Sequence, residues 1–299
     1  DGVIFHYDGS QWVIEDSGTT GELQQVWGLD SGSRVWALVG RWGISRVLER
    51  GENGWQASAA FGGATTVLND MDGVAESDLW AVGDNGVIVH SNGQESVNLV
   101  RSIGYLSDLC AHEAADGSIQ AWALSGGEDM LFYNGTDWSS YPMPLQFSGA
   151  EFVYCSGVHG IWVMTDDGEW GRFGASLLEQ GDPEFEFPIA QYLNAFDGRV
   201  TDGRVEMWGV GDAGLTAYFD GTSWTAGKMA DGQRFEMADV WVGPQGASPE
   251  VVAVGEAGGL LTLAGGTWTL HDEVTDLDLN GVWGVRLLLR CAGHLGHDG

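Results

Sequence analysis

Four stretches of the chain follow one plan: GVIFHYDGSQW (2–12), DMLFYNGTDW (129–138), GLTAYFDGTSW (214–224) and GLLTLAGGTW (259–268). Each begins as an alternating apolar run, continues into a turn centred on glycine, and ends at a tryptophan. The plan returns about every 43 residues, a period typical of arrays of identical supersecondary units. A residue that recurs in every unit is therefore expected to build the unit.

Each unit carries four strand signals in a fixed order. The first is L-x-x-Φ-x-G, as in LNDMDG (68–73), and the second is an apolar run around a tryptophan, as in DLWAVG (78–83). The third is the alternating run, and the fourth starts at the tryptophan after the turn. Period-two alternation between glycine- and Asx-rich turns predicts antiparallel strands joined by hairpins. Four such strands, repeated radially, form the blade of a β-propeller, with the tryptophans in its core.

The number and phase of the copies predict how the fold closes. First-strand copies begin near residues 23, 68, 106, 152, 193, 237 and 279. The copy at 279 has no third and fourth strands after it, whereas residues 2–15 supply those strands ahead of any first strand. We therefore predict an all-β, seven-bladed propeller over residues 1–299, a single domain whose last blade is completed by residues 2–15. Closure of this kind leaves no free sheet edge. The alternative is a piece of a longer array.

The charge balance excludes some partners. The chain has 43 acidic and 12 basic residues, a net charge of −31. Nucleic acids and anionic lipids are bound mainly through basic side chains, so we expect no nucleic-acid partner. No stretch is long and apolar enough to predict membrane insertion. The charge favours a soluble extracellular protein, and a surface for cations is the alternative. We expect a cleaved secretion signal and an extracellular, cell-surface or periplasmic location.

Three cysteines are too few for a disulfide framework. Cys110 and Cys155 occupy similar points of neighbouring repeats, so a bridge between them is possible. We favour the interpretation that both are small buried hydrophobes. Cys291, His294 and His297 follow a C-x₂-H-x₂-H pattern that transition metals can use. Because the pattern lies in a terminal tail, we predict no metal there.

The turn before the tryptophan carries a family resemblance. D-G-x-x-W at 8–12 and 220–224, with N-G-x-x-W at 134–138, resembles the Asp-box (BNR) repeats of sialidase-like propellers. The larger unit resembles secreted BNR/YVTN-type propeller repeats of bacteria and is similar to photosystem II assembly-factor propellers. The resemblance implies the fold. An Asp-box places one residue between its Asp and Gly, whereas here they are adjacent, and no matching arginine motif is present. No catalytic residue carries over.

The turns between second and third strands supply the candidate binding residues. We expect one face of the propeller to carry Asp84, Glu128, Asp166, Asp212 and Glu256. A ring of carboxylates could bind Ca²⁺ or a cationic ligand. The favoured alternative is that an Asp in G-D-x-G stabilises the turn by bonding its own backbone. The first unit replaces the acid with Arg41 and Trp42, a pair suited to contact a sugar or peptide. The irregular stretch 168–192 is a further candidate.

Three functional hypotheses follow. The leading one is a non-enzymatic propeller that binds a protein, peptide or glycan ligand through loops on one face, without a cofactor other than Ca²⁺. The second is a glycoside hydrolase or lyase with its site at the channel mouth. A carboxylate pair facing a pocket, with a raised pKa on one member, would favour this enzyme. The third is a structural module of a larger adhesin.

Overall fold

The structure, a computed structural model, describes residues 2–29, 34–40, 45–61, 66–93, 96–100, 104–126, 129–143, 147, 149–165, 169–173, 192–228, 235–271, 274–285 and 288–294. They fall into two compact units, residues 1–40, 46–58 and 189–299 in the first and residues 41–45 and 59–188 in the second. No helix in the described part of the chain is long and apolar enough to span a membrane.

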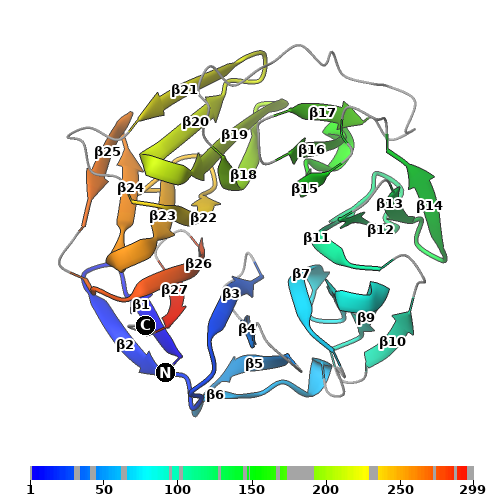
Figure 1. Cartoon of the computed structure of the whole chain (residues 1–299), viewed down its shortest axis with the longest axis horizontal. Coiled ribbons are helices and arrows are strands. Elements are labelled where there is room, and N and C mark those ends of the chain that lie inside the picture. Colours follow the sequence, from blue (N-terminus) through cyan, green and yellow to red (C-terminus); the bar gives the residue numbers. More distant parts are fainter. Residues whose placement is uncertain are drawn as a thin grey trace. The chain divides into compact units, whose positions relative to one another are not determined.

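The first unit contains four four-stranded antiparallel sheets, which we name blades A, B, F and G (Figure 1). Blade A consists of β1 (Val3–Tyr7), β2 (Trp12–Asp16), β26 (Asp278–Val285) and β27 (Leu288–His294); blade B of β3 (Leu23–Gly28), β4 (Val35–Val39), β5 (Arg46–Gly51) and β6 (Gly54–Ala57); blade F of β18 (Leu193–Thr201), β19 (Arg204–Gly211), β20 (Leu215–Phe219) and β21 (Trp224–Lys228); blade G of β22 (Met237–Val242), β23 (Val251–Gly255), β24 (Leu260–Ala264) and β25 (Thr267–Leu270).

The second unit contains blades C, D and E. Blade C consists of β7 (Leu68–Ala75), β8 (Asp78–Gly83), β9 (Val87–Ser91) and β10 (Ser96–Val100); blade D of β11 (Leu106–Glu113), β12 (Ile119–Ser125), β13 (Asp129–Tyr133) and β14 (Trp138–Pro142); blade E, which has three strands among the described residues, of β15 (Ala150–Cys155), β16 (Ile161–Thr165) and β17 (Trp170–Phe173). Residues 174–191, most of the predicted irregular stretch, lie outside the described part.

The predicted closure of the last blade is confirmed. β1 pairs with β2 on one side and with β27 on the other, where Val3 faces Gly293 and Phe5 faces Cys291. The sheet order β2-β1-β27-β26 thus joins the two ends of the chain in blade A. With this blade the fold is a seven-bladed β-propeller, as the repeat predicts.

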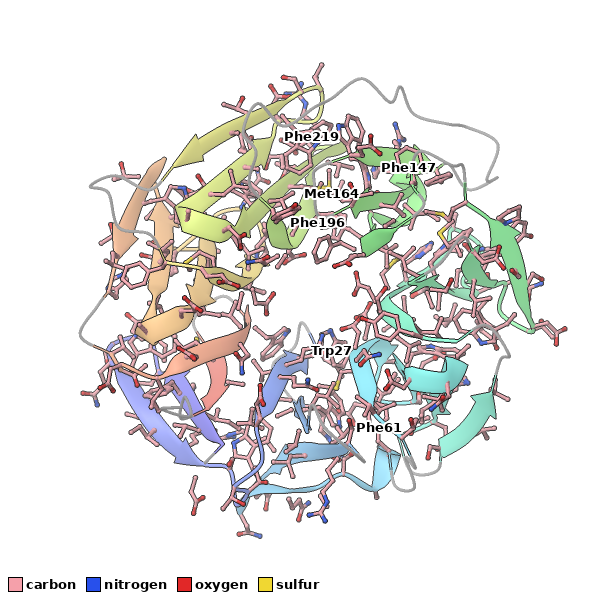
Figure 2. All side chains as sticks on the ribbon, in the orientation of Figure 1. Trp27, Phe61, Phe147, Met164, Phe196 and Phe219 are labelled. Carbon is pink, nitrogen blue, oxygen red and sulfur yellow. A yellow bond between two sulfur atoms is a disulfide. The ribbon has the colours of Figure 1, made fainter. Side chains whose placement is uncertain are left out.

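The second strands form the core, as the tryptophan repeat predicts. β4 and β23 are buried along their whole length. Trp36, Trp80 and Trp122 are at most 2% exposed. In blade B, Trp36 stacks on Trp27 of β3, which is labelled in Figure 2, with ring centroids 5.4 Å apart. The repeated tryptophans are therefore packing residues.

Asp side chains of the first strands link blades C, D and E. The Oδ2 atoms of Asp70 and Asp72 accept hydrogen bonds from the backbone N–H groups of Leu109 (2.8 Å) and Ala111 (2.7 Å) in the next first strand. The Oδ2 atom of Asp108 accepts one from Val153 (2.6 Å). Carboxylates of one first strand thereby pair N–H groups on the edge of the next first strand that has no strand partner.

The first unit repeats this linkage. The Oδ2 atom of Asp197 accepts from the N–H of Val242, and that of Asp239 accepts from the N–H of Val282, both at 2.8 Å. Positions are counted from the first residue of L-x-x-Φ-x-G. An Asp at the third position accepts a hydrogen bond from the N–H of the fourth residue in the next first strand. An Asp at the fifth position bonds the sixth residue.

Bulges let the same strands add a second link. The strand register shifts between the first and third positions, so the second residue bulges. Asn69, Asn194 and Asn280 occupy this position. Their Nδ2 atoms donate to the carbonyl oxygens of Leu106 (2.8 Å), Met237 (2.9 Å) and Leu23 (2.9 Å) in the following blades.

A disulfide joins Cys110 to Cys155, with Cα atoms 5.6 Å apart. The interpretation of both as small buried hydrophobes is therefore wrong. Cys110 holds the fifth position of β11 and Cys155 the sixth position of β15, so the bridge occupies the place that an Asp-to-amide hydrogen bond occupies elsewhere. Similar points of neighbouring repeats lie within bonding distance because adjacent first strands run side by side.

The D-G-x-x-W turns are built by their first side chain. Asp8 Oδ1 accepts from the N–H groups of Ser10 (2.8 Å) and Gln11 (3.0 Å). Asp220 and Asn134 form equivalent bonds. Gly9 has a φ of 95°, a conformation that favours glycine, which explains the invariant spacing. These residues shape a hairpin, and nothing in this geometry requires a ligand.

Candidate functional site

The predicted acidic turns are rigid elements of the backbone. In blades C, F and G, the short 3₁₀ turns Asp84–Gly86, Asp212–Gly214 and Glu256–Gly258 connect the second strand to the third. The N–H groups of Asp84, Asp212 and Glu256 donate to carbonyl oxygens just before the first strand of the same blade, at 2.9–3.0 Å. The backbone that carries each acidic side chain is thus held in place.

Two of these carboxylates also have structural partners. Asp84 Oδ1 accepts from Asn69 Nδ2 (3.2 Å), and Asp212 Oδ1 accepts from Asn194 Nδ2 (3.1 Å). Both Asp side chains are half-buried, whereas Glu256 is exposed. Asp84 and Asp212 therefore help to build the turn region, while Glu256 is the one of the three that presents its side chain openly to solvent.

The turns of blades F and G gather an exposed aromatic ring and several acids, which we name the acidic turn surface: Tyr192, Asp212, Glu236 and Glu256. Asp212 bonds the carbonyl of Tyr192, and Glu256 bonds that of Glu236. Tyr192 is 55% exposed. Partial burial, followed by the charges of Glu256 and Asp212, raises the pKa of Glu236. Glu236 therefore lies close enough to Glu256 and Asp212 for their like charges to contribute to this shift.

Sequence reasoning did not single out Tyr192 or Glu236. Both stand immediately before a first strand, where the apolar pattern has not yet begun, so periodicity gives no information about them. Tyr105 holds the same position in blade D of the second unit and is 50% exposed. An aromatic residue at this position in two repeats is the signal that could have identified the site.

The structure describes only some of the other predicted site residues. Arg41, Trp42, Glu128, Asp166 and His297 lie outside the described residues, as does the side chain of His294. The carboxylate ring and its Ca²⁺ therefore stay a prediction.

Cys291 is described, fully buried in β27 beside Ile4, Val26 and Val282. Burial raises the pKa of its thiol, which disfavours the thiolate that a metal would need. Among the described residues, no group of three or more His, Cys, Asp or Glu could hold a metal ion.

A buried carboxyl pair lies in the second unit. Asp108 hydrogen bonds to Asp70, and burial, with the nearby charge of Asp72, raises the pKa of Asp108 to about 6. A raised pKa in a carboxylate pair is one sign expected of a glycosidase. Here the two groups bond each other and the backbone of neighbouring strands, a spacing too short for a glycosidic bond to lie between them. The pair thus belongs to the interblade linkage.

The pair generates a prediction about pH. The folded pKa of Asp108 lies above the ordinary value of 3.8. The folded state therefore holds a proton that the unfolded state releases, and this group lowers stability progressively as pH rises from 3.8 to about 6. Asp108→Asn keeps an acceptor for Val153 and adds a donor for Asp70. It should raise the free energy of unfolding by about 1–3 kcal/mol at high pH, with a smaller gain as pH falls toward 5.

Denaturant unfolding at pH 8 and pH 5 measures this difference. Asp116→Asn is the control, because Asp116 lies in an exposed turn of the same blade and its pKa is lowered by its bonds to Ser118. If Asp108→Asn does not raise the free energy of unfolding, or raises it equally at both pH values, the raised pKa of Asp108 in the folded state is contradicted.

Comparison with known proteins supports the fold. No protein-family model matches the chain, and no curated protein matches it either. Among solved structures, the chain is similar to the WD40 β-propeller domain of Doa1 (TM-score 0.68, 12% identity, 96% of each chain covered). It is also similar to the Neurospora crassa Pan2 WD40 domain (0.64, 11%, 92% of this chain and 90% of that chain). A third similar structure is YCF48 bound to D1 peptide (0.61, 13%, 93% of each chain). At these identities the shared property is the β-propeller fold.

Proposed function

We propose that this chain is a non-enzymatic scaffold that binds a protein or peptide through the turns at one end of its blades. The observation that carries the proposal is the acidic turn surface, where an exposed tyrosine and exposed carboxylates stand on turns fixed by backbone hydrogen bonds. Rigid placement lowers the entropy cost of binding. The structure of YCF48 bound to D1 peptide gives a propeller of similar fold with a peptide ligand.

The chemistry of the surface favours a cationic partner. Glu236 and Glu256 are exposed and carry negative charge in a chain of net charge −31. A field of this sign attracts basic segments and speeds their association. Tyr192 adds a flat amphipathic ring, of the kind enriched at binding hot spots. The proposed ligand is therefore a basic peptide segment. Arg41, Trp42, Glu128 and Asp166, which lie outside the described residues, stay candidate binding residues from the sequence alone.

The disulfide supports a location outside the cytoplasm. Cys110 and Cys155 are bridged in blades D and E, and such bridges persist mainly in oxidising compartments. We include in the proposal that the chain is a secreted, cell-surface or periplasmic protein of the bacterial BNR/Asp-box type, in keeping with its D-G-x-x-W turns.

Neutralising the acidic turn surface should weaken binding of basic peptides. Glu236→Gln/Glu256→Gln removes two exposed charges and should raise Kd about fivefold or more for a peptide selected from an array of lysine- and arginine-rich sequences. Glu52→Gln/Asp202→Asn is the control. Like the test variant, it removes two negative charges. They come from turns at the opposite end of the blades, Glu52 in blade B, where it is exposed, and Asp202 in blade F.

Fluorescence anisotropy with the selected peptide at low and high salt gives the comparison. The proposal requires the control to bind as the parent does, and the effect of the double variant to shrink at high salt. Equal weakening by both variants, or failure of every basic peptide to bind, would contradict it.

Thiol trapping tests the location. Cells are lysed directly into alkylating reagent and denaturant, and the protein is analysed by mass spectrometry. An oxidising compartment predicts one alkylated thiol, that of Cys291, since the other two of the three cysteines are bridged. Three alkylated thiols would place the protein in a reducing compartment and reject this part of the proposal.

A further inference from the structure

A cavity of about 600 Å³ lies between blades A and G of the first unit. Its walls come from the β1–β2 hairpin and from the β24–β25 region, two segments that are neighbours in Figure 1. The lining residues are Tyr7, Ser10, Gln11, Trp12, Ser248, Pro249, Thr262, Ala264, His271 and Val274. The volume falls in the range of about 300–1,000 Å³ typical of small-ligand sites.

The hairpin wall is preorganised. Tyr7 and Trp12 flank the D-G-x-x-W turn, with ring centroids 5.3 Å apart, and both rings pack on the core of the unit. Asp8 holds the backbone between them through its bonds to Ser10 and Gln11. Tyr7, Trp12 and Gln11 therefore line the cavity from a fixed turn.

The opposite wall is equally ordered. Thr262 Oγ1 and His271 Nε2 are 2.9 Å apart, and the N–H of His271 donates to the carbonyl of Leu260 (2.8 Å). Ser248 and Pro249 precede β23, where the N–H of Glu250 bonds the carbonyl of Leu263 (2.8 Å). Two walls fixed in this way can select a ligand by shape as well as by contact.

The chemistry of the lining points to an uncharged ligand. None of the described residues that line the cavity is Asp, Glu, Lys or Arg. The described lining combines apolar and aromatic residues with polar ones. Within the described residues, the side-chain amide of Gln11 and the hydroxyl of Ser248 have no hydrogen-bond partner. They are therefore available to a ligand as donors and acceptors.

We propose that this cavity binds a neutral saccharide. A sugar ring presents hydroxyl groups around its edge and C–H groups on its faces. The Tyr7 and Trp12 rings can cover a C–H face while Gln11, Ser248 and Thr262 bond hydroxyl groups. Among the described lining residues none offers a formal opposite charge from Asp, Glu, Lys or Arg, which disfavours acidic and basic sugars. The described lining shares no residue with the acidic turn surface, so the two proposals are tested separately.

An array of neutral mono-, di- and trisaccharides identifies the probe, and isothermal titration measures its affinity. Gln11→Ala removes an exposed amide without touching the core and should weaken binding roughly tenfold. Ala264→Trp fills the cavity from an exposed position and should abolish binding. Ser223→Ala is the matched control, because Ser223 holds the position of Gln11 in the Asp220 turn of blade F.

The proposal requires saccharide binding that both cavity variants weaken and Ser223→Ala leaves unchanged, with all variants unfolding at similar temperatures. Absence of binding to every neutral saccharide at millimolar concentration would overturn it. So would equal affinities in all variants, or selective binding of uncharged peptides in place of sugars. Glu236→Gln/Glu256→Gln should leave saccharide binding unchanged, which separates this result from the test of peptide binding.

Discussion

The hydrogen bond from a backbone amide to the carboxylate of the neighbouring first strand is the interaction on which the rest of each unit depends. Within a blade, strands are joined by regular ladders, but among the described residues no ladder joins one blade to the next. The N–H groups on the unpaired edge of a first strand would otherwise have no partner in a strand. Asp197 and Asp239 pair those groups at 2.8 Å, and a charge-assisted bond contributes about 1.5–3 kcal/mol each.

This role changes the meaning of the acidic composition. Asp70, Asp108 and Asp197 are acids that the blades need for assembly, and they sit half-buried or buried among backbone groups. The exposed carboxylates of Glu236 and Glu256 are of a different kind, since they face solvent at the turns. A net charge alone cannot separate the two groups. Only the second group is available to a partner, which is why the proposed binding surface is built on it.

Much of the fold could be predicted because the repeat constrains it. The phase of the repeat predicted the closure of blade A, since residues 2–15 supply the third and fourth strands that the copy beginning at residue 279 lacks. The tryptophan positions predicted the core. The interblade bonds could not be predicted, because a pattern along one strand does not show which residue of the next strand faces it. For the same reason the sequence did not settle whether Cys110 and Cys155 are bridged, since the bridge joins the fifth position of one first strand to the sixth position of the next.

The sites were less predictable than the fold for a related reason. The acidic turns were found because they recur, whereas Tyr192 and Glu236 lie between the periodic segments. The cavity combines Trp12 with His271, residues that only the closure of blade A brings together.

The most direct test of the interblade linkage is residue-resolved amide hydrogen exchange in two single variants. We predict that Asp197→Ala accelerates exchange at Val242, and that Asp239→Ala accelerates exchange at Val282, each by roughly tenfold or more with little change at the other amide. Unchanged exchange at both amides, or a uniform acceleration over the whole chain, would contradict the claim that these carboxylates join the blades.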